Sequence, residues 1–157
     1  SVKIPESQFF LLLSGGKKYQ KKYQKLMEMI NQSTHKDKIT LLPPASSEEV
    51  RDYVNAVDCV IVPSVAEGFG YTTVEASAMN KPVVVSNAGS LPEVVSGKFH
   101  LFKSKDVLDL ADKVMKVARK EYLWKTPRRF EWKDCVEGYL QTYEPILEKK
   151  EEKKPHS

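Results

Sequence analysis

The sequence contains few of the residues that build metal centres and disulfide frameworks. It has 2 cysteines and 3 histidines among 157 residues. Cys59 and Cys135 lie far apart along the chain, and no histidine stands near either of them. A disulfide framework or a zinc site made of His and Cys is therefore not expected. We expect reduced thiols in a cytoplasmic protein, and no bound metal.

Long apolar runs are also absent. The longest, Phe9 to Leu13, is too short for a transmembrane helix or for the core of a signal peptide. The composition, 41% hydrophobic and 29% charged, is typical of a globular domain. We expect one domain over residues 1–147 and a charged flexible tail over residues 148–157.

Short apolar runs alternate with amphipathic stripes along most of the chain. This alternation predicts an α/β domain with a mainly parallel sheet and helices on both faces. One helix start carries a clear signal, because Ser46 and Glu49 have the spacing of a capping box. The expected strands are residues 9–13, 39–42, 59–62, 83–85 and 100–102, and the expected helices begin near residues 19, 47, 71, 106 and 132.

The loop from Glu67 to Gly70 has the residue types of a ligand site. Gly68 and Gly70 allow the backbone to approach a ligand closely. The helix that follows presents free N–H groups, which favour an anion. Because Glu67 and Glu75 flank this helix start, the pattern indicates a ligand with phosphates between two polyhydroxylated parts, such as a nucleoside diphosphate sugar.

Glu75 also has a purely structural interpretation. Thr72 stands three residues before it, and this spacing is that of a capping box. From the residues alone, both interpretations of Glu75 remain open.

The segment from Val62 to Ala76 resembles the signature of family-4 retaining glycosyltransferases of the GT-B fold. That signature has two glutamates separated by seven residues and an E-G-F-G turn, found here from Glu67 to Gly70. Pro82 to Val95 is similar to the strand and turn that follow in the family, and Arg129 to Trp132 with Tyr139 to Tyr143 are similar to its C-terminal helix. The resemblance covers about residues 9–147.

The resemblance implies a Rossmann-like three-layer αβα domain, the donor-binding half of a GT-B fold. It implies sugar transfer from a UDP-, GDP- or ADP-linked donor to a glycan, lipid or other acceptor, with retention at the anomeric carbon and without a metal or bound cofactor. Glu67 would be catalytic, beside the reacting carbon. The implied donor contacts are the amides of Gly68, Phe69 and Gly70 to the sugar and of Tyr71 and Thr72 to the diphosphate, Glu75 to the ribose, Ala45 and Ser46 to the base, and Gly15 and Gly16 beside the nucleotide.

Parts of the family pattern have no counterpart in this sequence. The N-terminal acceptor domain is absent. In the register that we favour, Phe9 to Leu13 is the domain's second strand, so the first strand and its phosphate-binding Arg and Lys are missing as well. Since that strand lies within the sheet, a gap is expected, to be filled by another chain or by a longer parent protein. In the other register Phe9 to Leu13 is the first strand, with Lys17, Lys18 or Lys21 as the phosphate partner, and a later strand–helix unit is deleted.

Other functions remain open beside the transferase. The chain could instead be a stand-alone nucleotide-sugar binding module without transfer activity. Because the acceptor half and the cationic pair are missing, we expect this chain alone to be inactive under either interpretation. Another GT-B enzyme, such as an epimerase or a phosphorylase, fits less well. The lysines between Lys17 and Lys25 could suggest nucleic-acid binding, but Tyr19 and Tyr23 lie on the apolar face, so we expect no nucleic-acid partner. Peripheral association of the parent enzyme with the cytosolic face of a membrane is a lesser option.

Overall fold

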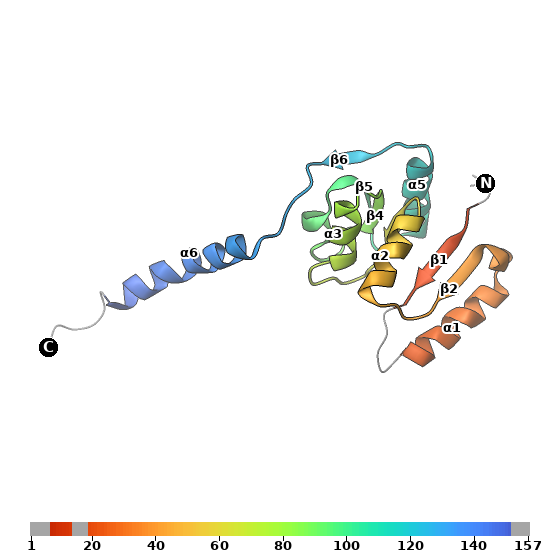
Figure 1. Ribbon diagram of the computed structural model, residues 1–157, viewed down its shortest axis with the longest axis horizontal. Coiled ribbons are helices and arrows are strands. Elements are labelled where there is room, and N and C mark those ends of the chain that lie inside the picture. Colours follow the sequence, from red (N-terminus) through yellow and green to blue (C-terminus); the bar gives the residue numbers. More distant parts are fainter. Residues whose placement is uncertain (1–6, 14–18, 152–157) are drawn as a thin grey trace. The chain divides into compact units, whose positions relative to one another are not determined.

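The computed structural model describes residues 7–13 and 19–151, and Figure 1 shows the order of its elements. The described chain forms two compact units, residues 1–126 and 127–157. The strands are β1 Phe9–Leu12, β2 Ile39–Leu42, β3 Val60–Val62, β4 Val83–Ser86, β5 Gly97–Phe102 and β6 Leu123–Lys125. The helices are α1 Tyr19–Gln32, a 3-10 turn Lys36–Lys38, α2 Ser47–Ala56, α3 Tyr71–Ala78, α4 Leu91–Val94, α5 Val107–Ala118 and α6 Trp132–Glu151.

The strands form two sheets, and this confirms the mainly parallel α/β prediction. The first contains β1 and β2, and the second has the order β3-β4-β5-β6. All pairs are parallel except β5 with β6, which are antiparallel. β6 was not predicted, because three exposed residues carry no alternating pattern.

The strand pairing agrees with the favoured register. β1 pairs with β2 over its full length, whereas β3 pairs with β4 alone among the described strands. In the usual strand order of a Rossmann-like domain, the first strand lies between the second and the fourth. If β1 were that first strand, it would pair with β3. The boundary between the two sheets therefore falls where the favoured register places the gap.

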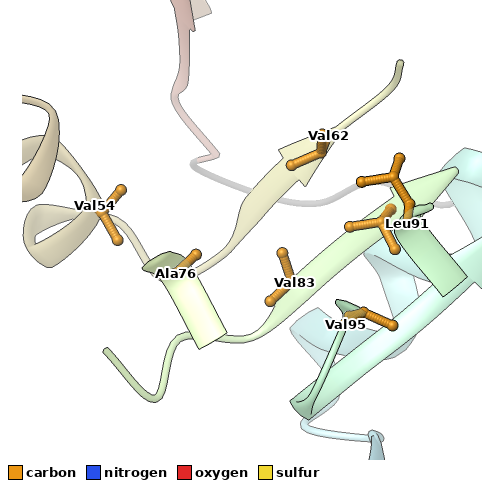
Figure 2. Packing of buried hydrophobic residues seen from close by; sticks show 7 residues of the cluster. Val54, Val62, Ala76, Val83, Leu91 and Val95 are labelled. Carbon is orange, nitrogen blue, oxygen red and sulfur yellow. The ribbon is translucent and has the colours of Figure 1, made fainter. Parts of the chain in front are cut away.

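Helices cover both faces of the four-stranded sheet. On one face, Val83 and Val85 pack with residues of α2, α3 and the α4 turn, as Figure 2 shows for the cluster around Val54, Ala76 and Leu91. On the other face, Val84 packs with Phe102 of β5 and with Val117 of α5. Because successive strand residues point to opposite faces, the run of β4 valines is buried on both sides, as in a central parallel strand.

The two-stranded sheet is much less buried. Phe10 of β1 is 51% exposed and Leu12 is 40% exposed. Ile30 of α1 is the one hydrophobic residue buried among residues 7–13 and 20–42, whose side chains the structure describes. Between α1 and β2 lies an open hollow of about 380 Å³, lined by side chains such as Tyr23 and Ile39.

Helix α2 is fixed at both ends. At its start, the predicted capping box is present, with Glu49 N–H donating to Ser46 Oγ and Ser46 N–H donating to Glu49 Oε2. Near its end, the Lys81 ammonium donates to the carbonyl oxygens of Asn55 (2.7 Å) and Val57 (2.9 Å). A cation near the final carbonyls of a helix also interacts favourably with the helix dipole.

Three of the predicted strands differ from the observed ones by one residue at one end, and larger differences occur after β4. β5 begins at Gly97, before the expected His100, and α4 is a one-turn helix that periodicity could not show. α6 begins at Trp132 as expected, extends to Glu151 and contains Pro145. Over the described ranges, no helix combines the length and apolar character that a membrane span requires.

Candidate functional site

The loop from Ser64 to Gly70 follows β3 and leads directly into α3. It lies at the carboxyl end of a parallel strand, which is where ligands bind in open α/β sheets. Glu67 is partly buried in this loop, and its Oε2 accepts a hydrogen bond from Ser64 Oγ at 3.2 Å. The loop therefore holds the predicted catalytic carboxylate in a defined position, and leaves part of it accessible.

Two glycines at this site are required by the chain itself. Gly70 has φ +94°, and a Cβ there would lie 2.7 Å from a methyl carbon of Leu91. Gly89, in the turn after β4, has φ +55°, and a Cβ there would lie within 2.2 Å of the Glu67 carbonyl oxygen. Both conformations strain any residue that has a side chain. The Gly89 turn thus packs against the backbone of the Glu67 loop.

Gly68 differs from these two glycines. A Cβ at Gly68 would meet no atom within 4 Å, and its φ is not in the positive range that favours glycine. Neither packing nor backbone conformation within the described chain requires glycine here. A ligand that approaches the backbone closely would require it.

The start of α3 is available to an anion. Its N-cap is Gly70, and no side chain caps it. The amides of Thr73 and Val74 donate to the Gly70 carbonyl, so those of Tyr71 and Thr72 have no partner within the helix. The capping-box interpretation of Thr72 and Glu75 is wrong, because Thr72 already lies inside the helix. Glu75 is exposed one turn from the helix start.

Two aromatic side chains flank the Gly70 turn. The rings of Phe69 and Tyr71 are tilted by 54°, with their centroids 4.9 Å apart. Tyr71 is 71% exposed. The family resemblance implies donor contacts only for the backbone amides of Phe69 and Tyr71. The structure adds that their rings contact each other beside the start of α3.

Glu75 lies beside the loop that was assigned to the base. An open hollow of about 340 Å³ is lined by Ser47 and Arg51 of α2, by Glu75 of α3, and by the apolar side chains of Val50, Val54, Ala78 and Met79. Ala45 and Ser46 directly precede Ser47. The structure therefore brings the start of α2 and Glu75 to one hollow.

The Ser46 hydroxyl already serves the helix cap. It accepts from Glu49 N–H at 3.3 Å, while the Ser46 N–H donates to Glu49 Oε2 at 2.7 Å. This bond from the backbone of Ser46 is the main cause that lowers the pKa of Glu49 below its usual value. The Ser46 carbonyl accepts from Val50 N–H at 2.9 Å, whereas the hydroxyl only accepts in the cap and keeps its hydrogen. A contact of Ser46 with a base would therefore donate this hydroxyl hydrogen.

Gly15 and Gly16 lie outside the described residues, as do Lys17 and Lys18. Within the ranges that the structure describes, no group of three or more His, Cys, Asp or Glu side chains could hold a metal ion. Burial raises the pKa of the Cys59 thiol to about 12, so this thiol remains protonated.

Sequence reasoning missed the serines that support the Glu67 loop. Ser86, the last residue of β4, is fully buried, and its hydroxyl donates to the Ser64 carbonyl. Ser90 donates to the Glu67 carbonyl from its N–H at 3.4 Å and from its hydroxyl at 3.5 Å. Small hydroxyl residues at the carboxyl ends of two adjacent strands were the available signal.

The fold and this loop define the class of the protein as a Rossmann-like α/β domain of the GT-B glycosyltransferases. The chain belongs to the family of glycosyl transferases group 1, which it matches over residues 2–133. This finding confirms the family that the E-G-F-G segment indicated.

The similar proteins are glycosyltransferases. The chain is 31% identical over 147 residues to an uncharacterized glycosyltransferase of Methanocaldococcus jannaschii, covering 87% of this chain and 40% of that protein. It is 34% identical over 115 residues to a D-inositol 3-phosphate glycosyltransferase of Mycolicibacterium smegmatis, covering 68% of this chain and 26% of that protein. The sucrose-phosphate synthase of Thermosynechococcus elongatus shares the fold, with a TM-score of 0.66 at 24% identity, over 92% of this chain and 39% of that structure. The chain thus spans well under half of each of these relatives.

Proposed function

We propose that this chain is the donor-binding half of a retaining glycosyltransferase that uses a nucleoside diphosphate sugar. The observation that carries the proposal is Gly68. It is a glycine without a structural requirement, placed between the partly buried Glu67 and the uncapped start of α3. Space beside this backbone, a carboxylate and free amides are what a sugar diphosphate needs.

Each part of the donor has a place in this arrangement. The free amides and dipole of α3 would bind the diphosphate and stabilise the negative charge that develops on it as the glycosidic bond breaks. The Glu67 carboxylate would accept hydrogen bonds from sugar hydroxyls beside the anomeric carbon. Glu75, which has no capping role, would accept from the ribose, and the hollow beside it would receive the nucleoside.

The proposal includes transfer without a metal ion. The departing diphosphate would be stabilised by the α3 start and by cationic side chains that this sequence lacks in the favoured register. The acceptor would bind to a second domain, since the chain covers 40% of its archaeal relative. We therefore expect this chain alone to bind a donor and to transfer little or no sugar.

Titration calorimetry with UDP, GDP and ADP tests the proposal directly. Saturable binding of one nucleotide that weakens in Glu75→Ala and in Gly68→Ala would support a donor site and would identify the base. The matched control is Glu144→Ala, an exposed helical glutamate outside residues 1–126. Failure of all three nucleotides to bind would contradict the proposal for this chain.

The binding module without transfer activity is distinguished by the product. Radiolabelled donor and a panel of acceptors would be incubated with the chain. Sugar transfer by the chain alone would contradict the expectation that an acceptor domain is required.

A further inference from the structure

We propose that Ser64 is a positioning residue for Glu67, whose hydroxyl fixes one carboxylate oxygen and so directs the other toward the donor sugar. The inference rests on the proposed function, because it concerns the same site. Ser64 Oγ donates to Glu67 Oε2 at 3.2 Å. Both side chains are partly buried, so this bond competes less with water than a surface bond would.

Ser64 is itself held in place by a neighbouring strand. The hydroxyl of Ser86 donates to the Ser64 carbonyl across the carboxyl ends of β3 and β4. Ser86 is fully buried, and a hydroxyl has a single hydrogen to donate. That hydrogen is used here on a loop carbonyl, so the end of β4 fixes the backbone from which the Ser64 side chain projects.

The backbone of Glu67 is fixed by the turn that follows β4. Its carbonyl oxygen accepts from Ser90 N–H at 3.4 Å, and a Cβ at Gly89 would lie within 2.2 Å of that oxygen. With the loop backbone held at the carbonyls of Ser64 and Glu67, the remaining freedom of Glu67 lies in its side-chain torsions. The bond from Ser64 restricts those torsions, which is how a supporting residue improves the geometry of a reactive group.

A hydroxyl suits this task better than a cation would. Within the part of the chain that the structure describes, no lysine or arginine forms an ion pair with Glu67. A neutral donor orients the carboxylate while its negative charge remains available. That charge would stabilise the positive charge that develops at an anomeric carbon during transfer.

The experiment separates the sugar from the nucleotide. Calorimetry with UDP, GDP and ADP, and with the glucose and mannose conjugates of whichever binds, measures how much the sugar adds to affinity. In Ser64→Ala, the affinity for the sugar conjugate should fall roughly fivefold to tenfold, the size of one hydrogen bond, while the nucleoside diphosphate binds within about twofold of the natural chain.

Three further variants make the result specific. Ser64→Thr keeps the hydroxyl and should restore the sugar contribution. Ser77→Ala is the matched control, because this buried serine has no hydrogen-bond partner in the structure. In a Glu67→Ala background, Ser64→Ala should cause no further loss, because a positioning residue acts through the group that it holds.

Each outcome bears on a separate claim. A sugar contribution that is unchanged in Ser64→Ala overturns the positioning role alone. An equal loss for diphosphate and sugar conjugate would also overturn it, because Ser64 would then support the whole loop. If the natural chain binds none of the nucleotides and none of the conjugates, the proposed function fails and the positioning role fails with it. Thermal unfolding of each variant excludes a loss of fold.

Discussion

The two sheets within residues 1–126 use the same parallel pairing but are buried to different degrees. In β4 of the four-stranded sheet, Val83, Val84 and Val85 are all fully buried, with helices on both faces. In β1 of the two-stranded sheet, Phe10 is 51% exposed although its strand is equally apolar. Both strands have the continuous apolar sequence of a central parallel strand, but only β4 is buried on both faces.

The difference in burial indicates which sheet holds the residues of the proposed donor site in fixed positions. The Glu67 loop, the start of α3 and the Gly89 turn all extend from the four-stranded sheet, whose packing fixes them. The two-stranded sheet leads instead to residues 14–18, where the notable glycines and lysines lie outside the described chain. We expect the four-stranded sheet to form the rigid half of the donor site.

The largest loss of stability is expected from a substitution at Gly89, in the turn that follows β4 of the four-stranded sheet. Gly89→Ala should lower the free energy of unfolding by roughly 3 kcal/mol or more, because it combines a positive φ with a backbone clash. Urea unfolding followed by circular dichroism measures the loss. Gly68→Ala is the matched control and should remain within about 0.5 kcal/mol of the natural chain, since the new methyl meets open space.

Truncating one apolar side chain in each sheet tests whether the two sheets differ in burial. Val84→Ala should cost about 2–3 kcal/mol, because it leaves a cavity in a fully buried strand. Leu12→Ala removes more atoms, yet it should cost less than about 1 kcal/mol, since Leu12 is 40% exposed. Urea unfolding measures both. Equal costs would show that the two sheets are buried alike in solution.

A smaller loss of stability is expected at the start of α2, where the exposed capping box of Ser46 and Glu49 stabilises a helix that covers the four-stranded sheet. Ser46→Ala should cost about 1 kcal/mol by removing the cap. Because the pKa of Glu49 is lowered in the folded state, its contribution is present above the pKa of the unfolded chain and is lost as the pH falls. Unfolding midpoints measured from pH 7 to pH 3 should therefore converge for the natural chain and Glu49→Gln.

The smallest expected effect is chemical and leaves the fold unchanged. Burial holds the pKa of Cys59 at about 12, so this thiol, which packs beside the four-stranded sheet, should react slowly with a disulfide reagent at pH 8. Cys135 is exposed and should react quickly. We expect one rapidly reacting thiol in the folded chain and two in urea. Rapid reaction of both thiols in the folded chain would show that the sheet opens readily around Cys59.

Much of this fold could be predicted because its signals are local. β2 was placed at its observed bounds, and the capping box of Ser46 and Glu49 gave the start of α2 to the residue. The gap between the sheets was also expected, since the favoured register left a strand without a counterpart. Short apolar runs and capping spacings work here because each element carries its own signal within a few residues.

The features that escaped prediction depend on contacts across the fold. Ser86 and Ser64 are 22 residues apart in sequence, and their bond exists because β3 and β4 end side by side. Spacing alone could not distinguish a helix starting at Tyr71 from one capped by Thr72. Gly68 was predicted as a site residue, but whether packing requires glycine there depends on surroundings that only the folded chain provides.

Lys81 has a consequence for how α2 could transmit a chemical change. α2 is about 15 Å long and is held at both ends. Its capping box lies near the hollow that Glu75 lines, and the Lys81 ammonium binds its last carbonyls beside β4. Acetylation of Lys81 would remove the charge and all but one of the ammonium's hydrogens, while the box at Ser46 stayed intact. α2 would then lose its anchor at the end far from the hollow, and a modification at that end would act through the helix on the loop that carries Ala45.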